Sequence, residues 1–82
     1  MKYLIVIERA GRNFSAYVPD LPGCIATGTT RAATRKSLQE AIAFHLEGLR
    51  ADGLPIPKPS AKGAEVLIPT ATKRPRPRRS AA

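Results

Sequence analysis

Residues 36–54, KSLQEAIAFHLEGLRADGL, decide the fold class of this chain, because they carry an apolar stripe with the period of an α-helix. The residues of the stripe recur every three or four positions: Leu38, Ala41, Ile42, His45, Leu46 and Leu49. Thr30 is suited to cap the start of the helix, while Gly53 and Leu54 fit the C′ and C″ positions of a Schellman cap. The sequence therefore predicts one amphipathic helix from about residue 30 to residue 52.

Short β-type segments flank this helix. Residues 2–8 (KYLIVIE) and 14–18 (FSAYV) are rich in β-branched and aromatic residues, and the Gly-containing turn between them predicts a hairpin. Residues 24–28 (CIATG) predict a third strand, and residues 64–68 (AEVLI) a fourth strand after the helix. The expected architecture is α+β in the order β-β-β-α-β, with one helix packed on a small sheet.

One helix covers only one face of such a sheet, yet the first strand is apolar on both faces. Tyr3, Ile5 and Ile7 share one face, while Leu4 and Val6 share the other. A second copy of the chain is the simplest cover for the remaining face, so we expect a homo-oligomer, most simply a dimer.

The only cysteine lies at the end of a turn, LPGC at residues 21–24, which has the proline and glycine spacing of a type II turn. A cysteine nucleophile needs a base to form the thiolate, and the only histidine, His45, lies in the helix stripe. We therefore interpret Cys24 and His45 as packing residues. With one residue of each type, the chain has no zinc ligand set, and no cofactor is predicted.

Composition bounds the remaining possibilities. The chain has 82 residues, enough for one small domain, and its single cysteine excludes an internal disulfide. No signal peptide and no apolar run of bilayer length are visible, so we expect a cytoplasmic protein without a membrane partner. Of the net charge of +8, residues 69–82 carry +5 and residues 1–68 carry +3. The segment 69–82 is predicted to be a disordered basic tail.

Four motifs in order resemble the HicB-like antitoxin family: YVPDLPGC at 17–24, EAI at 40–42, HLEGL at 45–49 and DGLPIP at 52–57. The resemblance covers about residues 1–68. It implies a partial, degraded RNase H-like fold and an antitoxin that binds and blocks a small HicA-type RNase toxin. Many members carry an additional DNA-binding domain, and the 14 residues after Ile68 are too few for one, so we expect a single-domain member.

Two sets of candidate binding residues follow. The shaped turn is the expected toxin-binding site: Pro19, Asp20, Leu21, Pro22 and Gly23. Cations at the helix entry and in the tail form the expected nucleic-acid-binding set: Arg31, Arg35, Lys36, Lys73, Arg74, Arg76, Arg78 and Arg79. The second set supports an alternative, an orphan relative that binds nucleic acid without reading its sequence.

A residual metal-dependent nuclease is a third hypothesis, since the RNase H-like resemblance raises it. That chemistry needs several carboxylates around metal ions. The six acidic residues are scattered along the chain, and no three can be placed together from the sequence. We therefore predict a binding protein with no catalytic residues and no metal site.

Overall fold

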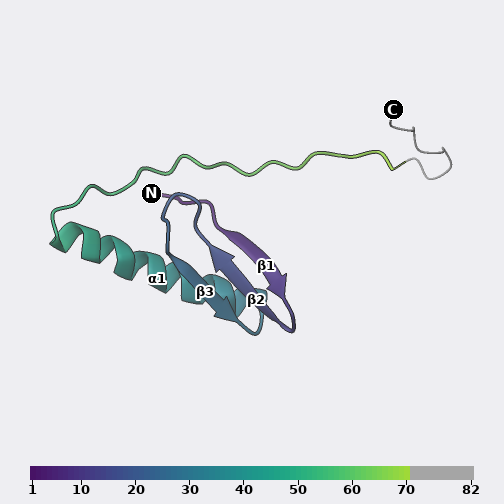
Figure 1. Ribbon diagram of the computed structural model, residues 1–82, viewed down its shortest axis with the longest axis horizontal. Coiled ribbons are helices and arrows are strands. Elements are labelled where there is room, and N and C mark those ends of the chain that lie inside the picture. The colour runs from purple at the N-terminus through teal and green to yellow at the C-terminus, as the bar shows by residue number, and fades with distance from the viewer. Residues whose placement is uncertain (71–82) are drawn as a thin grey trace, which may run out of the picture.

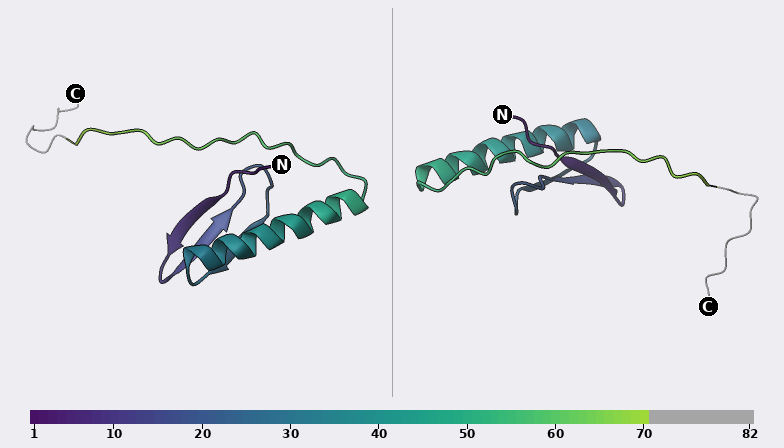
Figure 2. Two further views of the ribbon diagram at one scale, coloured as in Figure 1. Left: turned by 180° about the vertical axis from the view of Figure 1, so that it is seen from behind. Right: turned by 90° about the horizontal axis from the view of Figure 1, so that it is seen from above.

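A computed structural model describes residues 1–70 (Figure 1). Three strands, β1 (Val6–Ala10), β2 (Asn13–Tyr17) and β3 (Ile25–Gly28), precede one helix, α1 (Arg31–Ala51). The strands form an antiparallel sheet in the order β1-β2-β3, and α1 lies across one face of it (Figures 1 and 2). The predicted α+β class is confirmed, with three strands followed by the helix.

The hairpin forms where the alternating pattern predicts it, but β1 begins four residues later than expected. Val6 is paired with Tyr17, the last residue of β2. The ladder stops there because the Val18 amide donates to the carbonyl of Cys24 (3.3 Å), and Pro19 has no amide to donate. Residues 2–5 therefore run beside the sheet without a ladder partner, although their apolar pattern is that of a strand.

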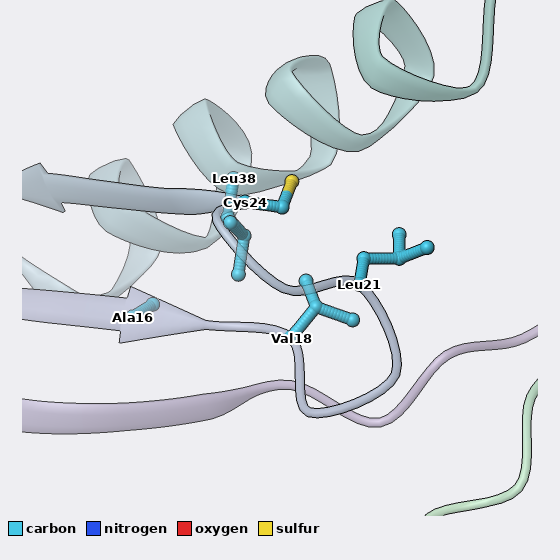
Figure 3. Packing of buried hydrophobic residues seen from close by; sticks show 5 residues of the cluster. All are labelled: Ala16, Val18, Leu21, Cys24 and Leu38. Carbon is cyan, nitrogen blue, oxygen red and sulfur yellow. The ribbon is translucent and has the colours of Figure 1, made fainter. Parts of the chain in front are cut away.

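A small core lies between the sheet and α1. Its buried members come from β2, the following turn and the helix: Ala16, Val18, Leu21, Cys24 and Leu38 (Figure 3). Leu21 and Leu38 are fully buried, and Tyr3, Ile5 and Ile7 pack against this cluster from the N-terminal segment. The helix stripe predicted from residues 38–49 thus supplies one wall of the core.

Both predicted ends of the helix are confirmed. The Thr30 hydroxyl accepts a hydrogen bond from the Ala33 amide at 3.0 Å, as an N-cap does. At the other end Gly53 has a φ of 68°, its amide donates to the Arg50 carbonyl at 3.1 Å, and the Leu54 amide donates to the Leu49 carbonyl at 2.9 Å. These two bonds define the Schellman motif.

After the helix the chain continues as an extended segment, residues 54–70, which we call the arm. The arm contains no strand, so the fourth strand predicted at 64–68 is wrong for this chain on its own. A β-strand requires main-chain hydrogen bonds to a neighbouring strand, and residues 64–68 extend away from the sheet and have no such neighbour within residues 1–70. Val66, Leu67 and Ile68 are 75%, 91% and 66% exposed.

Of the expected order β-β-β-α-β, residues 1–70 form the first four elements and not the final strand. The RNase H-like assignment stays a prediction of the resemblance. The residues of the expected tail from 71 onward lie outside the described part of the chain.

Candidate interaction surface

The loop between β2 and β3 is held in one shape by its own backbone. The Leu21 amide donates to the Val18 carbonyl, and the Cys24 amide donates to the Leu21 carbonyl, both at 3.1 Å. Gly23 has a φ of 84°, which confirms the type II turn predicted at 21–24. Two consecutive turns therefore present a rigid loop at the end of the sheet.

The predicted toxin-binding residues divide into buried and exposed members in this loop. Leu21 has no exposed surface and belongs to the core cluster, so its side chain anchors the loop (Figure 3). Pro19, Pro22 and Gly23 are exposed. These three residues are the exposed members of the predicted set, and Asp20 is half-buried.

Asp20 has a role that the sequence did not reveal, because its carboxylate holds the arm. One carboxylate oxygen accepts hydrogen bonds from the amides of Ser60 (2.9 Å) and Ala61 (3.0 Å), and the other accepts from the Ser60 hydroxyl (2.8 Å). The backbone amide of Ser60, then that of Ala61, then the Ser60 hydroxyl hold the pKa of Asp20 below its ordinary value of 3.8. No local sequence pattern joins positions 40 residues apart, so only the tertiary structure shows this contact.

Two further contacts keep the arm beside the N-terminal residues. The Tyr3 hydroxyl donates a hydrogen bond to the Pro57 carbonyl. Gly63 lies against Leu4, since a Cβ atom on Gly63 would stand 3.5 Å from Leu4 Cδ1. The arm is therefore attached at Pro57, Ser60 and Gly63, and it is free of the sheet beyond that point.

The sheet face opposite α1 has no helix over it among residues 1–70 (Figure 2). Tyr17 is 41% exposed and Ile25 is 67% exposed on that face, and Leu4 and Val6 are half-buried beside them. We call this surface the open face. It is the apolar surface for which the sequence predicted a cover.

Cys24 and His45 line the same shallow hollow, between the loop and the second half of α1, although the sequence placed them apart. Cys24 is 5% exposed as a residue, and burial raises the pKa of its thiol above the ordinary value. A raised pKa keeps the thiol protonated at neutral pH, whereas a nucleophile needs the thiolate. The hollow therefore has the residue types of a cysteine-histidine pair without an activated thiol.

The end of the molecule opposite the loop is basic. The guanidinium groups of Arg9 and Arg31 lie 5.3 Å and 5.2 Å from the centre of the Phe14 ring, within the range of cation–π contacts. Arg9 was absent from the predicted nucleic-acid set, because only the hairpin brings it to the helix entry. Arg35 and Lys36 are exposed in the first turns of α1. The predicted cations of the tail, from Lys73 to Arg79, lie outside the described residues.

No group of three or more His, Cys, Asp or Glu side chains that could hold a metal ion occurs within residues 1–70. In the same part of the chain, no helix is both long enough and apolar enough to cross a bilayer.

The model of a known protein family matches residues 3–69, and it describes the HicB-like antitoxin of bacterial toxin–antitoxin systems. This match includes the sheet, the loop, the helix and nearly all of the described arm. The chain belongs to the HicB-like antitoxin family. The predicted resemblance is thereby confirmed, and the loop and helix motifs on which it rested lie within the matched region.

Two individual proteins are similar in sequence to this HicB-like chain. An uncharacterized 14.9 kDa protein in the rep-hol intergenic region of Haemophilus phage HP1 is 40% identical over 58 residues, which are 71% of this chain and 44% of that protein. A UPF0150 protein of Thermoplasma acidophilum is 32% identical over 63 residues, 76% of this chain and 91% of that protein. The HicB-like chain thus spans less than half of the phage relative.

A solved structure also resembles it. A chain of the HicA3 and HicB3 toxin–antitoxin complex superimposes with a TM-score of 0.63 and 38% sequence identity, over 73% of this chain and 70% of that one. The three antiparallel strands and the helix are therefore an arrangement already seen in a toxin–antitoxin complex.

Proposed function

We propose that this HicB-like protein is an antitoxin that binds and inhibits a small RNase toxin of the HicA type. The observation that carries the proposal is the similarity, at 38% identity, to a chain of the HicA3 and HicB3 toxin–antitoxin complex. The match of the HicB-like family model over residues 3–69 supports it independently. Because the proposed toxin acts on cellular RNA, the complex would operate in the cytoplasm.

The exposed part of the loop is the proposed toxin contact. Pro19, Pro22 and Gly23 are presented on a backbone that two turns and the buried Leu21 side chain hold rigid. A rigid loop loses little conformational entropy when a partner binds it, which favours affinity. Asp20 is occupied by the arm, so in this proposal it supports the loop and the arm and does not contact the toxin.

Inhibition by binding requires no catalytic group, and the described residues are consistent with that. The burial of Cys24 disfavours its thiolate, and the carboxylates of residues 1–70 form no metal-binding group. The residual nuclease remains testable with highly purified protein and labelled RNA in the presence of Mg²⁺. RNA cleavage that Glu8→Gln or Glu40→Gln abolishes would contradict the proposal.

Co-expression tests the antitoxin role directly. The chain is expressed with the small toxin candidate encoded beside it, in a host that the candidate kills, and growth is expected to recover. Pro22→Arg should weaken the rescue, because it places a long cation on the exposed turn. Ser37→Arg is the matched control, since it adds the same side chain to the exposed first half of α1. Persistent killing with abundant, folded antitoxin would refute the proposal.

The open face supports a second proposal, that the protein associates with itself, most simply as a dimer. Tyr17 and Ile25 expose apolar surface that α1 does not cover. Burial of such surface between two copies is favourable by about 25 cal/mol per Å² of apolar area. Sedimentation at micromolar concentration should show a dimer that Ile25→Glu weakens, and a monomer at all concentrations would contradict it.

Non-specific nucleic-acid binding is the alternative function, favoured by the gathering of Arg9 and Arg31 on Phe14. Two cations on one ring repel each other, and a phosphate group nearby would relieve that repulsion. Fluorescence anisotropy with labelled single-stranded RNA should show binding that falls with salt and weakens in Arg31→Gln. Binding that responds neither to salt nor to this substitution would exclude the alternative.

A further inference from the structure

The far part of the arm has the composition of a strand but none of the contacts of one. Val66, Leu67 and Ile68 are consecutive aliphatic residues, and each exposes at least 66% of its surface. Exposing three neighbouring aliphatic side chains on an extended backbone costs free energy, and such segments pair readily with sheet edges. We call residues 64–68 the donor segment.

The sheet offers a matching acceptor at β1. In the order β1-β2-β3, β1 is an edge strand, so the backbone groups on its outer side have no strand partner within residues 1–70. Residues 2–5 continue this edge toward the N-terminus. A strand added here would obtain its main-chain hydrogen bonds from β1, the mode of peptide recognition known as β-augmentation.

An apolar groove next to this edge can receive side chains of the added strand. It lies between the N-terminal segment and α1, and its apolar lining includes Tyr3, Ile5, Ile7 and Ile42. Successive residues of a strand point to opposite faces. Val66 and Ile68 therefore share one face and Leu67 takes the other. In the arrangement that places two side chains in the groove, Val66 and Ile68 would enter it, while Leu67 would lie on the open face near Leu4 and Val6.

The donor segment does not reach this site in its own chain. The contacts at Pro57, Ser60 and Gly63 fix the near part of the arm beside residues 3 and 4. Beyond Gly63 the arm and β1 diverge, so the donor segment projects away from its own sheet (Figures 1 and 2). A second copy carries the same edge, the same groove and the same segment, which allows a symmetric exchange.

We propose that the donor segment of one chain adds as a strand to the β1 edge of a second chain, and the reverse. This rests on the self-association proposed above and adds a second contact to it, since Ile25 of the open face lies on β3 and the exchanged strand lies at the β1 edge. It differs from the fourth strand expected from the sequence, since the strand forms only across the interface. In this arrangement the Asp20 contact holds the near part of the arm at Ser60 and Ala61, and the donor segment beyond it extends away from its own sheet.

Sedimentation equilibrium of the full chain tests the exchange. Val66→Glu combined with Ile68→Glu should raise the dimer dissociation constant at least about 100-fold, because each chain would lose two buried aliphatic contacts. Phe44→Glu is the matched control, since Phe44 is 82% exposed on α1 and belongs to neither surface. The control should dimerise like the wild type, and circular dichroism checks that every variant is folded.

Hydrogen exchange of backbone amides provides the second readout. Protection of residues 64–68 and of the β1 edge should increase together as the protein concentration rises through the dissociation constant. A dimer that survives the double substitution would overturn the exchange while leaving self-association in place. A wild-type monomer would overturn both, and concentration-independent protection of residues 64–68 in that monomer would show that the segment folds onto its own edge.

Discussion

Replacing Gly28 by alanine tests how closely the sheet and the start of α1 are packed. A Cβ atom at this position would lie 2.7 Å from the Thr34 hydroxyl oxygen, 3.0 Å from the Thr34 amide nitrogen and 3.1 Å from its Cα. Thr34 is completely buried, and its hydroxyl donates a hydrogen bond to the Thr30 carbonyl at 2.6 Å. The added methyl group therefore meets backbone and a side chain that have no room to move.

The expected cost follows from two opposing effects. Overpacking of a closed contact costs about 1–3 kcal/mol. Alanine also lowers the conformational entropy of the unfolded chain, which stabilises the folded state by about 0.4–1 kcal/mol. The net loss should be about 1–2 kcal/mol, which in a domain of this size lowers the melting temperature by about 4–16 °C.

Gly48→Ala is the matched control, because it makes the same substitution within α1, where no heavy atom other than those of the neighbouring helix backbone lies within 4 Å of the added Cβ. Replacing glycine in the interior of a helix should stabilise the protein by about 0.5–1 kcal/mol. Both variants and the wild type are unfolded with urea and by heat at one protein concentration, since self-association would change the apparent stability. A Gly28→Ala protein as stable as the wild type would refute the close packing inferred here.

Three further outcomes are expected. Asp20→Ala should release the arm, so that the Ser60 amide exchanges with solvent as in an unstructured peptide. In the wild type, the protection of the Ser60 amide from exchange should be full above pH 3.8 and should be lost as the pH falls below 3.8, because its hydrogen bond is made to the charged carboxylate. Thr30→Ala should lower the unfolding free energy by about 0.5–2 kcal/mol in urea, and no change would mean that the cap is dispensable. Leu21→Ala should cost about 2–5 kcal/mol and unfold much of the protein at 37 °C, whereas a stable variant would show that the loop does not depend on this anchor.

Local patterns in the sequence were sufficient for the elements whose hydrogen bonds are mostly local. The 3.6-residue stripe, Thr30 and Gly53 predicted the helix to within a residue at each end, because caps and periodicity act over a few neighbouring positions. The type II turn at 21–24 was equally readable, since proline and glycine impose their backbone angles themselves. The four ordered motifs also indicated the family.

Tertiary structure alone decided which β-type segments became strands and what the polar residues of the loop do. Residues 2–5 and 64–68 have strand composition, yet a strand is defined by its neighbour, and the pattern of one segment does not state whether a neighbour is available. The contact between Asp20 and Ser60 joins positions 40 residues apart, and the gathering of Arg9 and Arg31 on Phe14 depends on the hairpin. Such contacts form when distant segments meet, so the residues carry no local mark of them before the chain folds.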